Sequence, residues 1–213
     1  MLKPSLFVTH SWYGNYLMLG SRWDEALREA ETGRKLDPVS LPTLVFLGWV
    51  RYYRREYDKA IEIGKRAVAL DKSFPHGHQL LAMSHGGKRD VASSLKESDE
   101  AFRLTSDPAV GYRYRAVALS QMPELEARGR DAAARVEALS QDRQAGYLAI
   151  AYAGLGDAAK TWHWIDRGAE RHDAALHMTI ISPRLDRYRK ELRFQELVAK
   201  LGYPQQDAAR PTR

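Results

Sequence analysis

Apolar residues recur along the first third of the chain with the spacing of one face of an α-helix. Four positions lie at i, i+3, i+4 and i+7 within residues 23–30, and the same spacing returns within residues 57–64. The two sets are Trp23, Ala26, Leu27 and Ala30, and Tyr57, Ala60, Ile61 and Gly64. Most positions between them are polar or charged, so each segment is predicted to be an amphipathic helix that packs through a single stripe.

The offset between these two helices is 34 residues, and other landmarks share it. Gly14 precedes Gly48 by 34 residues, and Leu36-Asp37 precedes Leu70-Asp71 by the same distance. Pro38 biases Asp37 away from the helical region and ends the first unit. A glycine within a helix costs about 1 kcal/mol relative to alanine, so Gly14 and Gly48 predict a close approach by a neighbouring helix. A fixed period of this length indicates repeated helical hairpins.

These residues resemble the tetratricopeptide repeat, most specifically in units 7–40 and 41–74. A fainter third unit spans 75–108, with Ser94 in place of the usual alanine. A fourth unit, 109–141, is interpreted as degenerate, because three arginines stand at places that are usually apolar: Arg115, Arg128 and Arg135. The resemblance implies an all-α fold, an α-α superhelix (solenoid) of about five helical hairpins.

The last third of the chain predicts a fifth unit over 142–175 and then a cap. The run Gly154-Leu155-Gly156-Asp157 reads as the turn of this hairpin, and the segment 183–202 contains a final amphipathic helix that ends at Gly202. Such a helix covers the last repeat of a solenoid. We therefore expect one domain over 1–203 and a disordered tail over 204–213. This ending is similar to the C-terminal repeat regions of bacterial regulators that carry a winged-helix, cyclase or kinase domain.

Composition narrows the class of protein. The chain has 213 residues, a net charge of +6 and no cysteine. The lack of cysteine excludes disulfides and thiolate metal sites and suggests the cytoplasm. No run reaches the roughly 20 apolar residues of a membrane helix, and residues 1–20 do not resemble a secretory signal. The basic residues occur in short groups with acidic neighbours, which argues against nucleic acid, although a nucleic-acid-binding helical repeat remains the alternative.

The sequence contains no motif that is specific to a catalytic or metal site. Gly154 to Ala159 has the letters of a dinucleotide-binding turn, but the helical pattern before it lacks the strand that this chemistry requires. His76 and His78 point to different sides of a helix, and no histidine set has the spacing of metal ligands. We therefore predict no catalytic residue, no metal site, no cofactor and a protein that is not an enzyme. An enzyme whose site the sequence does not reveal is the third hypothesis.

The remaining candidate is the concave groove that the resemblance implies. In this family the groove is lined by set positions of the first helix of each unit. Carried onto this sequence, the partner-binding candidates are Ser11, Asn15, Met18, Val45, Trp49, Tyr52, Gln79, Met83 and Arg113. Large aromatic residues such as Trp49 and Tyr52 dominate many interfaces. Phe46 and Leu80 stand where relatives that grip a peptide carboxylate have Asn and Arg, so that clamp is not expected. The leading hypothesis is a module that binds a peptide or protein segment, as the scaffold or sensory part of a regulator.

The start of the chain is a second candidate surface. Leu2 and Pro4 lie 34 residues before Leu36 and Pro38, so the first residues are expected to be the end of a preceding unit and not a polar cap. We expect exposed apolar groups on the first helix, and the candidates are Leu6, Phe7, Trp12 and Leu17. Contiguous apolar surface of this kind marks interaction sites. Residues 1–20 are therefore predicted to meet an upstream domain or a second copy of the chain.

Overall fold

The computed structural model describes residues 5–140 and 143–202, and their side chains from residue 9 onward. These residues form helices and turns without a strand, so the all-α prediction is confirmed. Five hairpins pair the helices α1 (Ser5–Leu19) with α2 (Trp23–Leu36), α3 (Leu41–Tyr53) with α4 (Tyr57–Leu70), α5 (Pro75–Gly87) with α6 (Val91–Arg103), α7 (Pro108–Leu119) with α8 (Glu126–Ser140), and α9 (Ala145–Gly154) with α10 (Ala158–Glu170). Three shorter elements follow, which are α11 (Leu176–Ile181), the 3-10 helix η2 (Pro183–Tyr188) and α12 (Leu192–Lys200).

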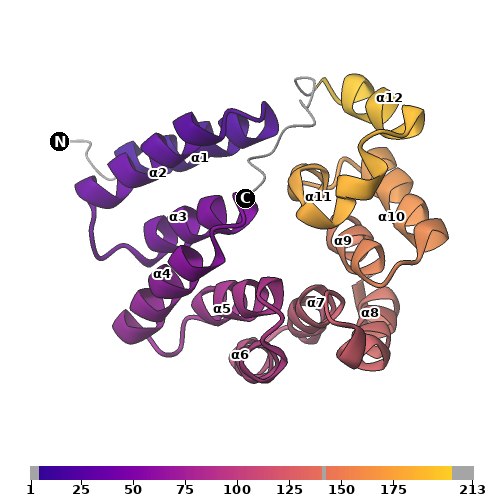
Figure 1. Cartoon of the computed structure of the whole chain (residues 1–213), viewed down its shortest axis with the longest axis horizontal. Coiled ribbons are helices and arrows are strands. Elements are labelled where there is room, and N and C mark those ends of the chain that lie inside the picture. Colours follow the sequence, from indigo (N-terminus) through magenta and orange to yellow (C-terminus); the bar gives the residue numbers. More distant parts are fainter. Residues whose placement is uncertain (1–4, 141–142, 203–213) are drawn as a thin grey trace.

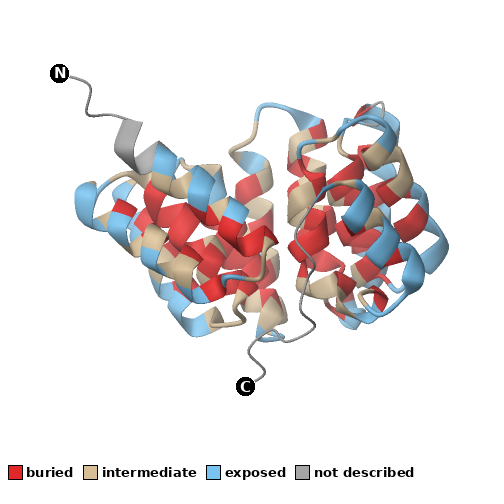
Figure 2. Ribbon diagram, turned by 90° about the horizontal axis from the view of Figure 1, so that it is seen from above, coloured by how far each residue is buried: buried red, intermediate tan, exposed pale blue. Residues whose placement is uncertain are grey.

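The hairpins stack into a curved double layer (Figure 1). The odd-numbered helices α1 to α9 contact one another in sequence and form the inner layer. Each even-numbered helix from α2 to α8 packs against its own partner and against the first helix of the next hairpin, and forms the outer layer. Burial follows this arrangement, with exposed residues gathered on the outside (Figure 2). Each hairpin therefore buries its stripe mainly against its neighbours, as in a repeat protein.

Glycines allow the inner helices to approach closely, as the sequence predicts. A Cβ atom on Gly14 would lie 2.6 Å from Cζ of Phe46, and one on Gly48 would lie 2.1 Å from Cδ2 of Leu80. The two contacts are 34 residues apart, so the same packing recurs between successive hairpins. Phe46 and Leu80 thus act as core residues that fill the space of the missing side chains.

The turns inside the hairpins repeat in the same way. Ser21, Arg55 and Arg89 have φ values of 57°, 63° and 62°, and each follows the inner helix of its unit. Gly156 has φ 78° in the turn between α9 and α10, which confirms that the glycine-rich run there is the turn of a helical hairpin. Gly202 also has positive φ, at the predicted end of the last helix.

The fourth hairpin forms, but its outer helix is shifted against the 34-residue period. The 3-10 turn η1 (Pro123–Leu125) precedes α8. The buried positions of α8 include Gly129, Ala132, Ala133 and Val136. Arg128 and Arg135 are exposed beside this stripe. The two arginines stand at usually apolar places of the repeat, but they lie outside the core because the helix register is shifted by one residue after η1.

The first helix agrees with the predicted apolar exposure only in part. Trp12 is 71% exposed, and Tyr13 and Tyr16 are also exposed. Leu17 is fully buried, so its predicted exposure is wrong: it turns inward, toward the rest of the core. Leu6 and Phe7 have side chains outside the described residues. Trp23, at the start of α2, is 5% exposed and belongs to the main core.

The C-terminal elements fold back across the inner layer. Helix α11 contacts α9 and, from the far end of the chain, α1 (Figure 1). An ion pair joins Arg55, at the end of α3, to Asp186 in η2. The array is therefore closed by its own segment 176–188 instead of presenting an open inner channel. Helix α12 follows, with Phe194 and Val198 buried and the guanidinium of Arg193 4.4 Å above the ring of Trp162.

Candidate binding site on the inner face

One pocket on the inner face brings together side chains from five different helices. Its volume is about 180 Å³. It is lined by Trp49, Tyr52 and Tyr53 of α3, His76, Gln79 and Met83 of α5, Arg113 and Val117 of α7, Tyr147 and Ile150 of α9, and Met178 and Ser182 around α11. We call it the inner pocket. Because the repeat places equivalent residues side by side, half of the lining residues derive from two positions of the unit.

The period of the sequence explains this convergence. A spacing of 34 residues relates Gln79, Arg113 and Tyr147. The same spacing relates Trp49, Met83 and Val117. Residues at one repeat position form a row across adjacent inner helices, since those helices pack against one another. The two rows lie one helical turn apart and form neighbouring parts of the wall.

Arg113 is the charged centre of the inner pocket. Its guanidinium lies 4.3 Å above the ring of Tyr147 and 4.8 Å from the ring of Tyr114. One terminal nitrogen donates to Oε1 of Gln144 at 3.2 Å. Its Nε is buried and has no hydrogen-bond partner among the described residues. Aromatic faces hold the cation in place without neutralising it, so Arg113 keeps both its charge and a donor for a further group.

His76 stands beside Arg113 at the rim. The hydroxyl of Tyr114 lies 3.2 Å from Nδ1 of His76. His76 is exposed as a residue, but neighbouring side chains partly desolvate its ring and lower its pKa; a hydrogen bond with Gln79 raises the pKa, and the charge of Arg113 lowers it further. The net direction is downward, so the neutral imidazole is favoured at neutral pH. A neutral His76 leaves Arg113 as the one charged residue in the pocket wall.

The segment 176–188 covers one side of the inner face. Arg184 of η2 donates to Oγ of Ser120 at 3.2 Å and lies 3.6 Å from the sulfur of Met83. Burial lowers the pKa of the Arg184 guanidinium, while the nearby hydroxyls of Tyr52 and other tyrosines act in the opposite direction. Removing a charge from water is costly, so this segment is held by specific polar contacts as well as by its apolar residues.

Five of the nine residues predicted to bind a partner line the inner pocket together, namely Trp49, Tyr52, Gln79, Met83 and Arg113. Val45 is buried in a small separate cluster with Leu44 and Ala67. Ser11, Asn15 and Met18 lie on α1, outside the pocket wall, and Met18 is fully buried. Tyr52, Gln79 and Met83 are themselves buried, so a partner would meet mainly Trp49 and Arg113.

Several pocket residues were absent from the sequence prediction. Tyr147 continues the row of Gln79 and Arg113 at the same 34-residue spacing, so the period could have identified it. Met178 and Ser182 come from the returning segment, which has no counterpart in the repeat. Tyr53 lies next to a groove position and reaches the pocket through the aromatic cluster it forms with Trp49 and Tyr52.

The histidines considered as metal ligands form ordinary structural contacts. His78 points away from His76, as predicted, and lies 2.7 Å from the carboxylate of Glu97 and 3.1 Å from the carbonyl of Lys72. Within the described part of the chain, no group of three His, Asp or Glu side chains could hold a metal ion. None of the helices described there is long and apolar enough to cross a bilayer.

The basic residues gather in two sequence groups, within residues 51–55 and 184–193, and most of them are engaged within the molecule. Arg51 pairs with Glu31 and Glu56, and Arg54 pairs with Asp24 and Glu56. In the second group, Arg189 pairs with Asp186, Arg193 pairs with Asp166, and Arg187 donates to the carbonyl of Ala153. These cations are therefore paired locally or bonded to a carbonyl, and where the two groups meet, Arg55 and Arg189 share the carboxylate of Asp186. This arrangement differs from the continuous patch expected of a nucleic-acid site.

Comparison with solved structures agrees with the fold. The chain superimposes on TTC0263, a thermophilic tetratricopeptide-repeat protein of Thermus thermophilus, with a TM-score of 0.59 and 18% identity, over 92% of this chain and 98% of that one. The MamA protein matches with a TM-score of 0.49 and 18% identity, over 80% and 93%. Comparison of the sequence with family profiles and with curated proteins finds no match. The chain thus has the tetratricopeptide-repeat fold, an α-α superhelix.

Proposed function

We propose that this chain is a protein-interaction module without catalytic activity that holds a short segment of a partner protein in the inner pocket. The observation that carries the proposal is the state of Arg113. It is the charged member of the pocket wall, it is fixed by two tyrosine rings, and it forms no ion pair with a carboxylate of the described residues. A guanidinium without a carboxylate partner in a pocket supports an anion supplied by a ligand.

The chemistry of the wall defines the ligand. Trp49, Tyr147 and Met178 are only partly buried and provide apolar and aromatic surface around Arg113. A carboxylate is the natural partner of a guanidinium, and aromatic walls favour an apolar body next to it. The partner segment is therefore one that carries an Asp, Glu or terminal carboxylate beside a hydrophobic side chain.

Size favours a peptide side chain over a cofactor. Pockets that hold drug-sized ligands have volumes of roughly 300 to 1,000 Å³. The inner pocket has about 180 Å³, which accommodates one or two side chains. Because segment 176–188 covers the inner face, the bound segment is expected to be short and to enter at the rim near His76.

The likeness of the chain's ending to bacterial regulators supports a role as the scaffold or sensory part of a regulator. The cysteine-free composition fits a reducing compartment such as the cytoplasm. In such a role, binding at Arg113 would bias the contacts between segment 176–188 and the inner helices, since both use the same face.

A peptide-display selection tests the proposal. Random peptides are selected on the wild-type chain, and the selected sequences are then assayed on Arg113→Gln and Trp49→Ala. We expect a carboxylate beside an apolar residue in the selected peptides and weaker binding to both variants, while circular dichroism shows that both remain folded and the melting temperature of Arg113→Gln is unchanged. Ser11→Ala, on α1, is the matched control. Equal binding to all variants would refute the site. Binding of oligonucleotides in place of peptides, with a log affinity that falls linearly with log salt concentration, would favour the nucleic-acid alternative.

A further inference from the structure

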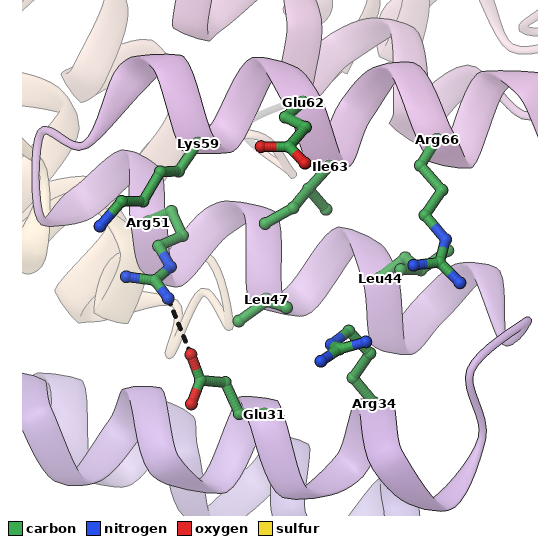
Figure 3. A pocket seen from close by; sticks show the side chains of 9 residues that line it. All are labelled: Glu31, Arg34, Leu44, Leu47, Arg51, Lys59, Glu62, Ile63 and Arg66. Carbon is green, nitrogen blue, oxygen red and sulfur yellow. Dashed lines mark hydrogen bonds and ion pairs between the residues drawn. The ribbon is translucent and has the colours of Figure 1, made fainter.

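A second pocket lies on the outer side of the first two hairpins, among α2, α3 and α4. It has a volume of about 340 Å³ and differs in character from the inner pocket. Its wall is formed by Glu31 and Arg34 of α2, Leu44, Leu47 and Arg51 of α3, and Lys59, Glu62, Ile63 and Arg66 of α4. We call it the outer pocket. In Figure 3, α2 and α4 form its two sides and α3 lies between them.

The floor of the outer pocket is apolar and fixed. Leu44 and Leu47 are buried core residues, and Ile63 packs against them from α4. Side chains in such a position have settled rotamers and do not need to move to receive a ligand. An apolar side chain placed on this floor would be stabilised by about 25 cal/mol for each Å² of apolar surface that it buries.

The cations at the rim differ in what they already bind. Arg51 is occupied by Glu31 at 2.7 Å and Glu56 at 2.5 Å. Arg34 makes no ion pair or hydrogen bond to any residue that the structure describes, and Arg66 donates only to the carbonyl of Pro38 at 3.3 Å. The two side chains enter the pocket from opposite sides, Arg34 from α2 and Arg66 from α4 (Figure 3). Neither forms an ion pair with a carboxylate of the described residues.

The equivalent groove two repeats later has no cation at the positions of Arg34 and Arg66, where Phe102 and Ala134 stand. A pocket of about 350 Å³ there is lined by Tyr112, Arg115 and Leu119, which correspond to Leu44, Leu47 and Arg51 at an offset of 68 residues. Its Arg115 is paired with Asp99 at 2.9 Å and lies over the ring of Phe102. Asp99 corresponds to Glu31, which pairs with Arg51 in the outer pocket, so both grooves contain one such ion pair and only the outer pocket has the two further cations.

We propose that the outer pocket binds an acidic segment of a partner protein, with an apolar side chain on the Leu44–Leu47–Ile63 floor and a neighbouring carboxylate between Arg34 and Arg66. A carboxylate matches the fork of each guanidinium. The apolar floor suits an aliphatic side chain, which a nucleic acid does not carry, and this makes a nucleic acid the poorer fit. The site is separate from the inner pocket and does not depend on it.

The test uses a defined probe and a matched pair of variants. A blocked Glu-Glu-Leu-Glu-Glu peptide is titrated into the ¹⁵N-labelled chain, beside a Gln-Gln-Leu-Gln-Gln peptide and a uridine oligonucleotide. One variant carries Arg34→Glu and Arg66→Glu. The control carries Arg128→Glu and Arg135→Glu on α8, two exposed arginines, and has the same change in net charge. Arg113→Gln reports separately on the inner pocket.

The proposal expects saturable shifts of amide signals in α2, α3 and α4 with the acidic peptide and much weaker shifts with the glutamine peptide. Affinity should fall roughly tenfold or more in the Arg34/Arg66 variant and stay near the wild-type value in the control and in Arg113→Gln. The proposal is wrong if the acidic peptide does not bind, if both charge-reversed variants lose affinity equally, or if only the oligonucleotide binds at these helices.

Discussion

Arg55 and Asp186 lie 131 residues apart in the chain and form an ion pair that joins the end of α3 to η2. Both side chains are partly exposed, so the pair contributes less than about 1 kcal/mol to stability. Its effect is to hold segment 176–188 on the inner face. We expect Arg55→Ala to speed hydrogen exchange in α11 and η2 while the melting temperature changes little.

The control for this experiment is Arg103→Ala, which removes an exposed pair with Glu100 inside α6. Exchange in α11 and η2 should not respond to it. If Arg55→Ala leaves the exchange of this segment unchanged, the ion pair does not contribute to closing the array.

Trp23 anchors the first hairpin. The ring is 5% exposed within the main core, so Trp23→Ala should lower the free energy of unfolding by roughly 3 to 5 kcal/mol. Trp12→Ala removes the same type of side chain from a site that is 71% exposed, and should change the free energy of unfolding by less than about 0.5 kcal/mol. Denaturant titration measures both. Equal losses would show that the register of α1 and α2 is wrong.

The sequence predicted those parts of the fold that are local and periodic. Spacing alone identified the helical stripes, and the offset of 34 residues identified the hairpins and the close approach at Gly14 and Gly48. The same period gave the row that contains Gln79 and Arg113, which is why much of the inner pocket could be anticipated.

The closure of the array could not be predicted in this way. It rests on contacts such as Arg184 with Met83 and Ser120, whose partners are far apart in sequence and occur once. No period reports a contact that does not repeat. The register shift of α8 could not be predicted for a related reason, because η1 changes the register within one unit only. Arg128 and Arg135 therefore stand at usually apolar places of the 34-residue period although they lie outside the core.

Glu56 predicts a dependence of stability on pH. Burial by itself would raise its pKa, but hydrogen bonds from Arg54, Arg51 and Lys59 outweigh burial and lower the pKa to about 2. The unfolded chain has the ordinary pKa of 4.5, so the stabilisation is complete above that pH and is lost as the pH falls toward 2. Solvent reaches part of this cluster and screens it, so the contribution stays below about 3 kcal/mol.

Glu56→Gln should therefore flatten the decline in stability over this acidic range, as measured by chemical denaturation at a series of pH values. Glu62→Gln, which changes an exposed carboxylate of α4, should leave the slope as it is in the wild type. An unaltered slope in Glu56→Gln would mean that this carboxylate is not held by its arginines.

The exposed aromatic side chains of α1 predict self-association. Trp12 and Tyr16 are 71% and 55% exposed, and Tyr13 stacks beside Tyr16 with ring centroids 6.4 Å apart. We expect light scattering over a concentration series to show a dimer that Trp12→Ser with Tyr16→Ser abolishes. Leu192→Ser, at the exposed start of α12, is the control. A chain that is monomeric at every concentration would leave this surface without a role in self-association.

The central claim is that Arg113 binds a carboxylate of the partner segment, and a double-mutant cycle measures this most directly. A peptide selected on the inner pocket is compared with its acid-to-amide form on the wild-type chain and on Arg113→Gln, by calorimetric titration. A hydrogen bond to a charged group predicts a coupling free energy of about 1.5 to 3 kcal/mol between the two changes. A coupling near zero, with each change acting independently, would contradict the proposed function.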